Sequence, residues 1–338
     1  MSQFLKKVVF FIFTASLLFG MILFGTTRFI SEGNYFEVPQ NISSLILGHS
    51  QSACSLKDSI LPGTLNLSQN AEGYPYSYFK AKKILENNPQ IENIFLEFTN
   101  NQLVDFAKNR VYGEYIDINV SKNLPVLESD FIFQIFWKNK NPIKITRTLS
   151  QALTSNVSFI LDEDSNYVES KWHYYEVPNR IYTPTDKISK SFFEDKLMNF
   201  KSKIKELTFP LLLHDLEKED VVESINMGYL KKLLELCNDN GVNLYFIRSP
   251  LPSGTKFANE NLFREILNNE FKDVIFLDFK EFPIQNNKFA DPLHLNTSGQ
   301  KEFTLFFKRS IEDGVLHKSN PQNLIDFKMI NYQIDKEF

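Results

Sequence analysis

Cysteine is scarce in this sequence, which excludes a scaffold stapled by several disulfides. Cys54 and Cys237 are the two cysteines among 338 residues, and no C-x-x-C pair is present. Two such thiols cannot build a disulfide framework, and they lack the spacing of a zinc site. Because Cys237 falls on the apolar stripe of a predicted helix, we expect a buried free thiol there, with a single Cys54–Cys237 bridge as the alternative.

The sequence also lacks an excess of basic residues. Lys and Arg number 37 against 41 Asp and Glu, which gives a formal net charge of −4. A nucleic-acid-binding surface needs clustered positive charge to neutralise phosphates, so we expect no nucleic acid among the partners. Hydrophobic residues make up 43% of the chain. A chain of this length and composition can bury a core without the help of metals or disulfides.

Charged residues are missing from one long apolar run near the N-terminus. VVFFIFTASLLFGMILFG, residues 8–25, precedes Arg28 and follows Lys6 and Lys7. As a helix it would be roughly 27 Å long, close to the thickness of a bilayer core. The positive-inside rule then places the N-terminus in the cytoplasm. We expect residues 1–28 to be a single-pass signal anchor and the rest to be extracytoplasmic, in the periplasm or at the cell surface; a cleaved signal peptide is the alternative.

The remainder alternates short apolar runs with amphipathic segments. The expected strands cover residues 42–48, 64–68, 94–98, 243–248 and 274–279. The expected helices cover residues 75–87, 230–237 and 262–267, and a last helix begins near Thr297, where T-S-G-Q matches a capping box with Gln300. Strands separated by helices predict a mostly parallel sheet covered on both faces, which is a three-layer α/β/α fold.

Residues 103–225 interrupt this alternation with mixed polar and aromatic stretches. We expect them to form a large, mainly helical insertion lying over the sheet edge or the site. The α/β domain then consists of residues 29–102 and 226–316. The polar residues 317–338 have little periodicity, so we expect a tail or a partly ordered extension.

Ser50 stands directly after the first expected strand, in GHSQSACSL, at the point where a helix begins. In an open parallel sheet, ligands bind beyond the carboxyl ends of the strands. Backbone N–H groups at the start of a helix can stabilise an oxyanion there. For an isolated serine, an ordinary helix N-cap is the alternative interpretation.

A second group of polar residues lies near the other end of the chain, in FADPLHLNTSGQ. Asp291 and His294 share one short loop before the last helix, also on the carboxyl side of a strand. A serine nucleophile needs a base to take its proton, and the imidazole needs a partner on its second nitrogen. A capping or turn cluster is the alternative. Together with Ser50, the two residues indicate nucleophilic acyl chemistry, which requires no cofactor and no metal.

Four sequence blocks resemble the SGNH (GDSL-type) hydrolase superfamily. They are a strand ending in G-x-S, the Asn- and Gly-bearing NLSQNAEGY, a strand ending in Asn within EFTNNQ, and the D-x-x-H-L-N block. The chain looks most similar to membrane-anchored members that modify cell-surface polymers, of the D-alanyl-lipoteichoic acid biosynthesis type and the polysaccharide O-acetyltransferase type. The resemblance covers residues 40–102 and 226–315 and implies a flavodoxin-like sheet topology.

The resemblance assigns roles by position. Ser50 matches the nucleophile, His294 the general base and Asp291 its orienting carboxylate. The oxyanion hole would combine the backbone N–H groups of Ser50 and of Gly73, from the second block. Its third donor would be the side chain of Asn100, from the third block, with Asn101 as the competitor.

The chain departs from the family pattern in each of the first three blocks. The family's G-D-S is G-H-S here, so His49 replaces a carboxylate that ordinarily supports the loop. Gly73 stands a few residues late, and the third block lacks its leading glycine. We expect His49 to pack or hydrogen-bond within the loop; contact with substrate is the alternative.

The resemblance implies a serine esterase or O-acyltransferase that acts on acyl esters of a cell-surface polysaccharide or envelope polymer through an acyl-serine. For a transferase, it also implies a multi-pass membrane acyltransferase that delivers the acyl group. The altered blocks favour a rival from another class, in which an SGNH-like envelope protein serves without catalysis as a glycan-binding or assembly module.

Overall fold

The computed structural model describes residues 2–103, 107–162, 166–173, 177–182, 224–257 and 259–337. Its centre is a sheet of five strands in the order β2-β1-β3-β4-β5, and every neighbouring pair is parallel. The strands are β1 (Ser44–Leu47), β2 (Thr64–Asn66), β3 (Asn93–Glu97), β4 (Asn243–Arg248) and β5 (Ile275–Asp278). The predicted α/β fold with a parallel sheet is confirmed. The order 2-1-3-4-5 is that of doubly wound sheets of the flavodoxin type.

The strands form because short apolar runs are buried on both faces of the sheet. In β1, Leu45 and Leu47 belong to the hydrophobic core on one face, whereas Ile46 belongs to the core on the other. Strands of a parallel sheet covered on both sides read as such continuous apolar runs.

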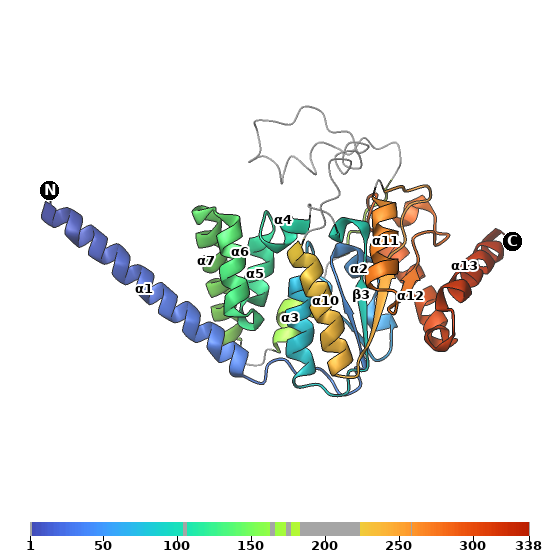
Figure 1. Ribbon diagram of the computed structural model, residues 1–338, viewed down its shortest axis with the longest axis horizontal. Coiled ribbons are helices and arrows are strands. Elements are labelled where there is room, and N and C mark those ends of the chain that lie inside the picture. The colour runs from blue at the N-terminus through green and yellow to red at the C-terminus, as the bar shows by residue number, and fades with distance from the viewer. Residues whose placement is uncertain are drawn as a thin grey trace, which may run out of the picture.

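Helices cover both faces (Figure 1). The first face is covered by α3 (Tyr74–Leu85), α10 (Ser224–Asp239) and α11 (Glu260–Glu270). The second is covered by α2 (Ser50–Ser55), α12 (Thr297–Glu312) and α13 (Pro321–Glu337). Connections from β1 and β3 therefore leave toward opposite sides, which makes the carboxyl ends of these two neighbouring strands the topological switch point where ligands bind in such sheets.

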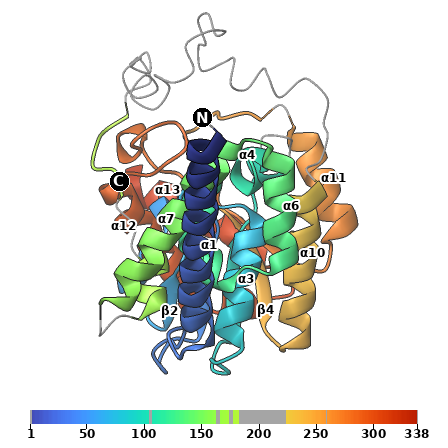
Figure 2. The ribbon, with the colours of Figure 1, turned by 90° about the vertical axis from the view of Figure 1, so that its left-hand side faces the viewer.

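The predicted insertion is helical where the structure describes it. It contains α4 (Lys108–Val111), α5 (Ile116–Asn123), α6 (Ser129–Asn139) and α7 (Pro142–Ile160), followed by one π-helical segment (Val168–His173). These helices continue the α3 layer outward from the sheet (Figures 1 and 2). Residues 183–223 of the insertion lie outside the described residues.

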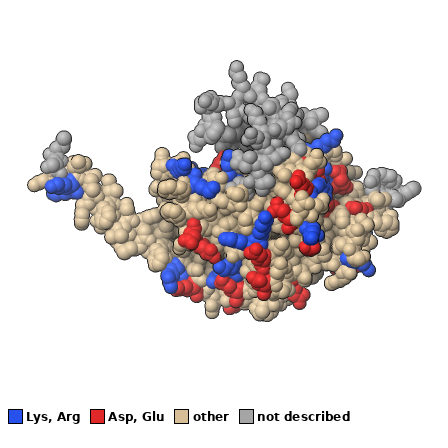
Figure 3. All heavy atoms as spheres, viewed as in Figure 1, with Lys and Arg blue, Asp and Glu red and all other residues tan. Residues whose placement is uncertain are grey.

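The N-terminal helix α1 (Ser2–Glu32) projects from the domain (Figure 1). It is long and apolar enough to cross a membrane, by length and composition, with a mean hydropathy of 2.5 over its most apolar stretch. Figure 3 shows no charged side chains along its middle. Its base is fastened to α7, because Asn156 Nδ2 donates to Thr27 Oγ1 at 3.0 Å. Just after α1, the Tyr35 ring packs edge-on against Phe159 of α7.

The start of α12 differs from the predicted capping box. Asn296 is the N-cap residue, and its side chain accepts from the backbone N–H of Gly299 at 3.0 Å. The Gln300 side chain does not return to its own helix terminus. It donates to the carbonyl oxygen of Ala53 in α2 at 3.0 Å, so it joins two helices.

The C-terminal segment is a helix rather than a loose tail. Gln322 of α13 accepts from the backbone N–H of Asp278 at 2.7 Å and donates to its carbonyl at 3.0 Å, which pairs the edge strand β5. Ile325 and Met329 are buried against the sheet. The few apolar residues of this helix are enough to hold it in place, because it packs against a single edge strand.

Neither cysteine forms a disulfide, and both are buried. The buried thiol expected at Cys237 is therefore confirmed, and burial raises the pKa of this thiol to about 12. The alternative of a Cys54–Cys237 bridge is wrong.

Candidate active site

The loop after β1 turns sharply at Gly48, which brings Ser50 to the first position of α2. Gly48 has φ +147°, a conformation that side-chain-bearing residues rarely adopt. A Cβ atom there would lie 2.6 Å from Ser52 Oγ and would collide with the Glu97 side chain. The glycine is therefore required for the close approach of this corner to β3.

The structure brings Ser50, His294 and Asp291 into one hydrogen-bonded chain. His294 Nε2 lies 2.7 Å from Ser50 Oγ. His294 Nδ1 lies 2.8 Å from Asp291 Oδ1 and 3.0 Å from Oδ2. These distances suit proton transfer from a serine hydroxyl to an imidazole whose second nitrogen is held by a carboxylate.

The loop that carries His294 is built around Asp291. Its Oδ1 accepts the backbone N–H groups of Leu293 at 2.9 Å and His294 at 3.1 Å. Gln51 of α2 donates its side-chain amide to the Leu293 carbonyl at 3.3 Å. The turn thus fixes the imidazole relative to Asp291, and Gln51 fixes the turn relative to the helix that begins with Ser50.

Asp291 is held as a carboxylate. Burial alone would raise its pKa, but hydrogen bonds from His294 and the Leu293 N–H, together with the charge of Arg180, lower the pKa below its usual value. Arg180 Nη2 lies 3.3 Å from Asp291 Oδ2. An ionised Asp291 keeps the hydrogen of the neutral imidazole on Nδ1 and leaves Nε2 free to accept from Ser50.

His49 lies in a buried polar cluster under the nucleophile loop. Its Nδ1 accepts the backbone N–H of Gln51 at 3.3 Å, so the ring hydrogen is on Nε2. Nε2 faces three oxygens: Glu97 Oε1 at 2.7 Å, and Thr99 Oγ1 and Asn101 Oδ1 at 3.1 Å each. The side chain is 1% exposed. The structure therefore places His49 within the loop, as the packing interpretation expects.

Glu97 supplies a carboxylate to this loop from the neighbouring strand. Its Oε2 accepts the backbone N–H groups of His49 at 3.1 Å and Ser52 at 2.8 Å, and also the Ser52 hydroxyl. Burial alone would raise the pKa of Glu97, but contact with His49 and the bonds from Ser52 lower it. Burial also lowers the pKa of His49, to about 4, so the pair consists of a neutral imidazole and a carboxylate.

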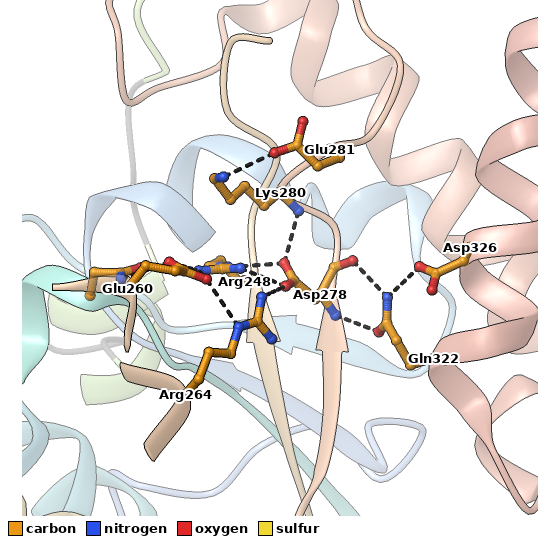
Figure 4. Close-up of polar contacts among 9 residues, drawn as sticks. Arg248, Glu260, Arg264, Asp278, Lys280, Glu281, Gln322 and Asp326 are labelled. Carbon is orange, nitrogen blue, oxygen red and sulfur yellow. Dashed lines mark hydrogen bonds and ion pairs between the residues drawn. The ribbon is translucent and has the colours of Figure 1, made fainter. Parts of the chain in front are cut away.

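Asn100 takes part in a charged network with Arg248 and Glu260. Its Oδ1 accepts from Arg248 Nη1 at 3.1 Å, and its Nδ2 donates to Glu260 Oε2 at 2.9 Å. Arg248, at the end of β4, also binds Asp278 Oδ1 through Nε at 2.9 Å (Figure 4). Figure 4 shows Arg264 between the carboxylates of Glu260 and Asp278.

Asn101 lies nearer the nucleophile loop. Its Oδ1 accepts from Thr99 Oγ1 at 2.8 Å, lies 3.1 Å from His49 Nε2 and takes a longer bond of 3.4 Å from Arg110. Among the described residues, its Nδ2 donates no hydrogen bond. Because the contacts with Thr99 and His49 restrain the amide oxygen, the N–H₂ group is a restrained donor close to the carboxyl ends of β1 and β3. The resemblance assigns the oxyanion role to Asn100, with Asn101 as its competitor; of the two, Asn101 is the one that contacts the nucleophile loop, through His49.

Gly73 is buried as the N-cap residue of α3. A Cβ atom there would lie 3.1 Å from both Asn226 Oδ1 and a Val111 methyl group, so a glycine allows close packing against α10 and α4. Within the described part of the chain, its backbone N–H donates no hydrogen bond. The same holds for the backbone N–H of Ser50.

Glu97 and Arg248 were not predicted from the sequence. Each is a charged residue at the end of an otherwise apolar strand, Glu97 in IFLEF and Arg248 in NLYFIR. Lys, Arg, Asp and Glu are rarely buried unless paired, so a charge at a buried strand position is itself a signal. It does not reveal the partner, which comes from a distant segment.

The residues described include no group of three or more His, Cys, Asp or Glu side chains placed to hold a metal ion. A model of a protein family without an assigned function matches residues 167–316. No curated protein matches the chain. The matched range contains Asp291 and His294 but not Ser50, and it covers less than half of the 338 residues, so it assigns neither family nor activity to the whole chain.

Proposed function

We propose that this chain is a membrane-anchored serine esterase or O-acyltransferase of SGNH type that acts on acyl esters of a cell-surface polysaccharide or similar envelope polymer. The observation that carries the proposal is the chain of short contacts from Ser50 Oγ through His294 to Asp291. Its position beyond the carboxyl end of β1, at the switch point of a doubly wound sheet, supports a ligand site there.

Ser50 Oγ attacks the acyl carbonyl carbon while its proton passes to His294 Nε2. Asp291 stabilises the imidazolium and keeps its orientation. As the tetrahedral intermediate collapses, the bond to the leaving alkoxide breaks and Nε2 returns the proton to that oxygen. A water molecule or a sugar hydroxyl then attacks the acyl-serine by the same route, which restores the Ser50 hydroxyl.

The developing oxyanion needs donors that are already in place. We assign this role to the backbone N–H of Ser50 and the Asn101 amide, since among the described residues neither donates elsewhere and the oxygen of Asn101 is held. Gly73 remains our expectation for a third donor. The alternative role of Asn100 would require breaking its bonds to Arg248 and Glu260.

We place the active domain outside the cytoplasm. This proposal rests on Lys6 and Lys7 before the apolar part of α1, which the positive-inside rule assigns to the cytoplasmic side. In a transferase, a multi-pass membrane acyltransferase would deliver the acyl group, and α1 would hold the domain beside it.

The test is labelling of the full chain in detergent with a fluorophosphonate probe, followed by mass mapping. We expect the label on Ser50, with none on Ser50→Ala. Release of acetate from a chromogenic acetate ester then separates the two activities: a hydrolase needs water alone, whereas a transferase is accelerated by a sugar acceptor and yields the acetylated sugar. Folded protein that stays unlabelled would support the rival binding or assembly module.

A further inference from the structure

The hairpin of α6 and α7 presents large apolar side chains to the outside. On α6, Phe133 and Trp137 are 70% and 71% exposed, and their rings stack with centroids 6.0 Å apart. They line a shallow hollow with Ser129, Ile132 and Phe136. Two aromatic rings that are stacked on each other but open to the outside form a preassembled apolar surface.

A second exposed apolar surface lies along α7. Ile143 and Leu161 are 80% and 76% exposed, and Val157 lies between them on the same side of the helix. Leu153 and Val157 line a second shallow hollow. Water-soluble monomers rarely expose clusters of large apolar side chains, so two such surfaces on neighbouring helices indicate a partner surface.

The α6–α7 hairpin stands beside the N-terminal helix. Figure 2, viewed from the side on which α1 leaves the domain, shows α1 in front with α6 and α7 on either side. The base of α1 is fixed to α7 by the Asn156–Thr27 hydrogen bond. A membrane crossed by α1 therefore lies on this side of the domain.

Basic residues accompany the apolar side chains. Lys138, Lys140 and Arg147 are exposed on the hairpin, whereas Lys144 is paired with Asp117 at 3.0 Å. Figure 3 shows basic side chains on the part of the body next to α1. Aromatic rings at the level of the headgroups, with Lys and Arg reaching lipid phosphates, are typical of segments lying in a membrane interface.

We propose that the exposed face of the α6–α7 hairpin rests in the interface of the phospholipid bilayer that α1 crosses. This inference depends on the anchoring role of α1 in the proposed function, but not on catalysis. A single helix lets a domain rotate and tilt freely. A second contact, formed by α6 and α7, fixes the orientation of the domain and the height of Ser50 above the membrane.

The two tryptophans of the chain make a direct test feasible, because Trp137 is exposed and Trp172 is fully buried. The full chain is placed one copy per nanodisc in phosphatidylcholine and phosphatidylglycerol, with or without brominated acyl chains. We expect the brominated lipid to quench Trp137 and a water-soluble quencher to leave it largely unaffected. Trp137→Phe, which retains Trp172, should lose the lipid quenching.

A Trp137 that is reached by the aqueous quencher and not by brominated lipid would overturn the inference and leave a protein partner as the occupant. A second copy of the chain cannot shield Trp137 in these single-copy nanodiscs. Failure of the anchor itself gives a different result, since chain that is extracted from vesicles by alkaline carbonate would show that α1 does not span the bilayer.

A charged substitution supplies the matched comparison. Phe133→Asp should weaken lipid quenching of Trp137 while α1 keeps the chain resistant to carbonate. Phe327→Asp alters an equally large side chain, 61% exposed on α13 at the opposite end of the molecule, and should leave quenching unchanged. Equal effects of the two substitutions would contradict an interface formed by the α6–α7 hairpin.

Discussion

His49 Nε2 lies 2.7 Å from Glu97 Oε1, and the two side chains are 1% and 0% exposed. The pair joins the loop before Ser50 to β3, since Glu97 also accepts backbone N–H groups of the loop. His49 in turn contacts the Asn101 oxygen. One buried cluster therefore positions both the proposed nucleophile and the proposed oxyanion donor. It contains a carboxylate, Glu97, although His49 stands where the SGNH pattern has an aspartate.

The buried His49 predicts that stability falls in mild acid. Burial lowers its pKa from 6.5 to about 4, so the unfolded chain binds a proton in this window that the folded chain does not. The free energy of unfolding should therefore decrease as the pH falls from 6.5 to about 4. The loss attributable to His49 is about 3 kcal/mol in total. Denaturant unfolding at a series of pH values measures it.

His49→Gln keeps an amide donor for Glu97 and removes the titrating group, so its stability should depend less on pH in this window. The His173–Asp58 pair affects stability at higher pH than His49 does. Hydrogen bonding to Asp58 raises the pKa of His173, so its contribution is complete below the unfolded value and is lost as the pH rises through the folded value. An unchanged slope in His49→Gln would contradict our assignment.

Ser50, His294 and Asp291 should act as a unit. We expect His294→Ala to lower the rate of Ser50 acylation by roughly 10⁴ to 10⁶ and Asp291→Asn by roughly 10⁴, because the asparagine leaves the imidazole without its carboxylate partner. Stopped-flow or burst measurements with a chromogenic ester give these rates. The double variant should be scarcely worse than His294→Ala. Full activity in either single variant would remove the role assigned to that residue.

The fold could largely be predicted from the sequence because its signals are local. Apolar runs such as SLIL and IFLE and the stripe ending at Cys237 report strands and helices without knowledge of their neighbours. The proximity of Asp291 to His294 is also local, since both belong to one turn. The contact of His294 with Ser50 follows only from the rule that sites gather at one edge of a parallel sheet.

The details that could not be predicted depend on distant partners. The binding of Asn100 by Arg248 and Glu260, which leaves Asn101 as the asparagine in contact with His49, depends on two such distant residues. Residues 321–337 form a helix that packs beside the edge strand β5, where Gln322 accepts a backbone N–H of that strand. Helix pattern alone was too weak in this segment, so tertiary contacts decided its structure.

Exchanging each asparagine separately should distinguish their roles. Asn101→Ala removes a donor to the oxyanion, so we expect fluorophosphonate labelling of Ser50 to slow by roughly 10² to 10³. Asn100→Ala leaves Arg248 and Glu260 without one partner each and should cost about 1 to 3 kcal/mol of stability, with a nearly normal labelling rate. The opposite pattern, with slow labelling in Asn100→Ala, would return the oxyanion role to Asn100.

Arg248 should be one of the larger single contributors to stability. It is 2% exposed and pairs with Asp278 at 2.5 Å and Glu260 at 2.9 Å. Arg248→Met removes one of the positive charges that compensate the largely buried Asp278 carboxylate. We expect the free energy of unfolding to fall by about 3 to 5 kcal/mol, seen as a lower denaturant midpoint. Labelling of Ser50 in the fraction that remains folded should proceed normally, since Arg248 binds Asn100 and not the nucleophile.

Lys280 provides the matched control, because it lies beside the same network, just after β5, but pairs with Glu281, whose side chain is 63% exposed (Figure 4). Lys280→Met should change stability by roughly 0 to 1 kcal/mol, as is usual for exposed pairs. Equal denaturant midpoints for the two variants would show that the attraction within the Arg248 network only offsets the cost of removing its charges from water. In that case the cluster would fix the position of Asn100 more than it stabilises the fold.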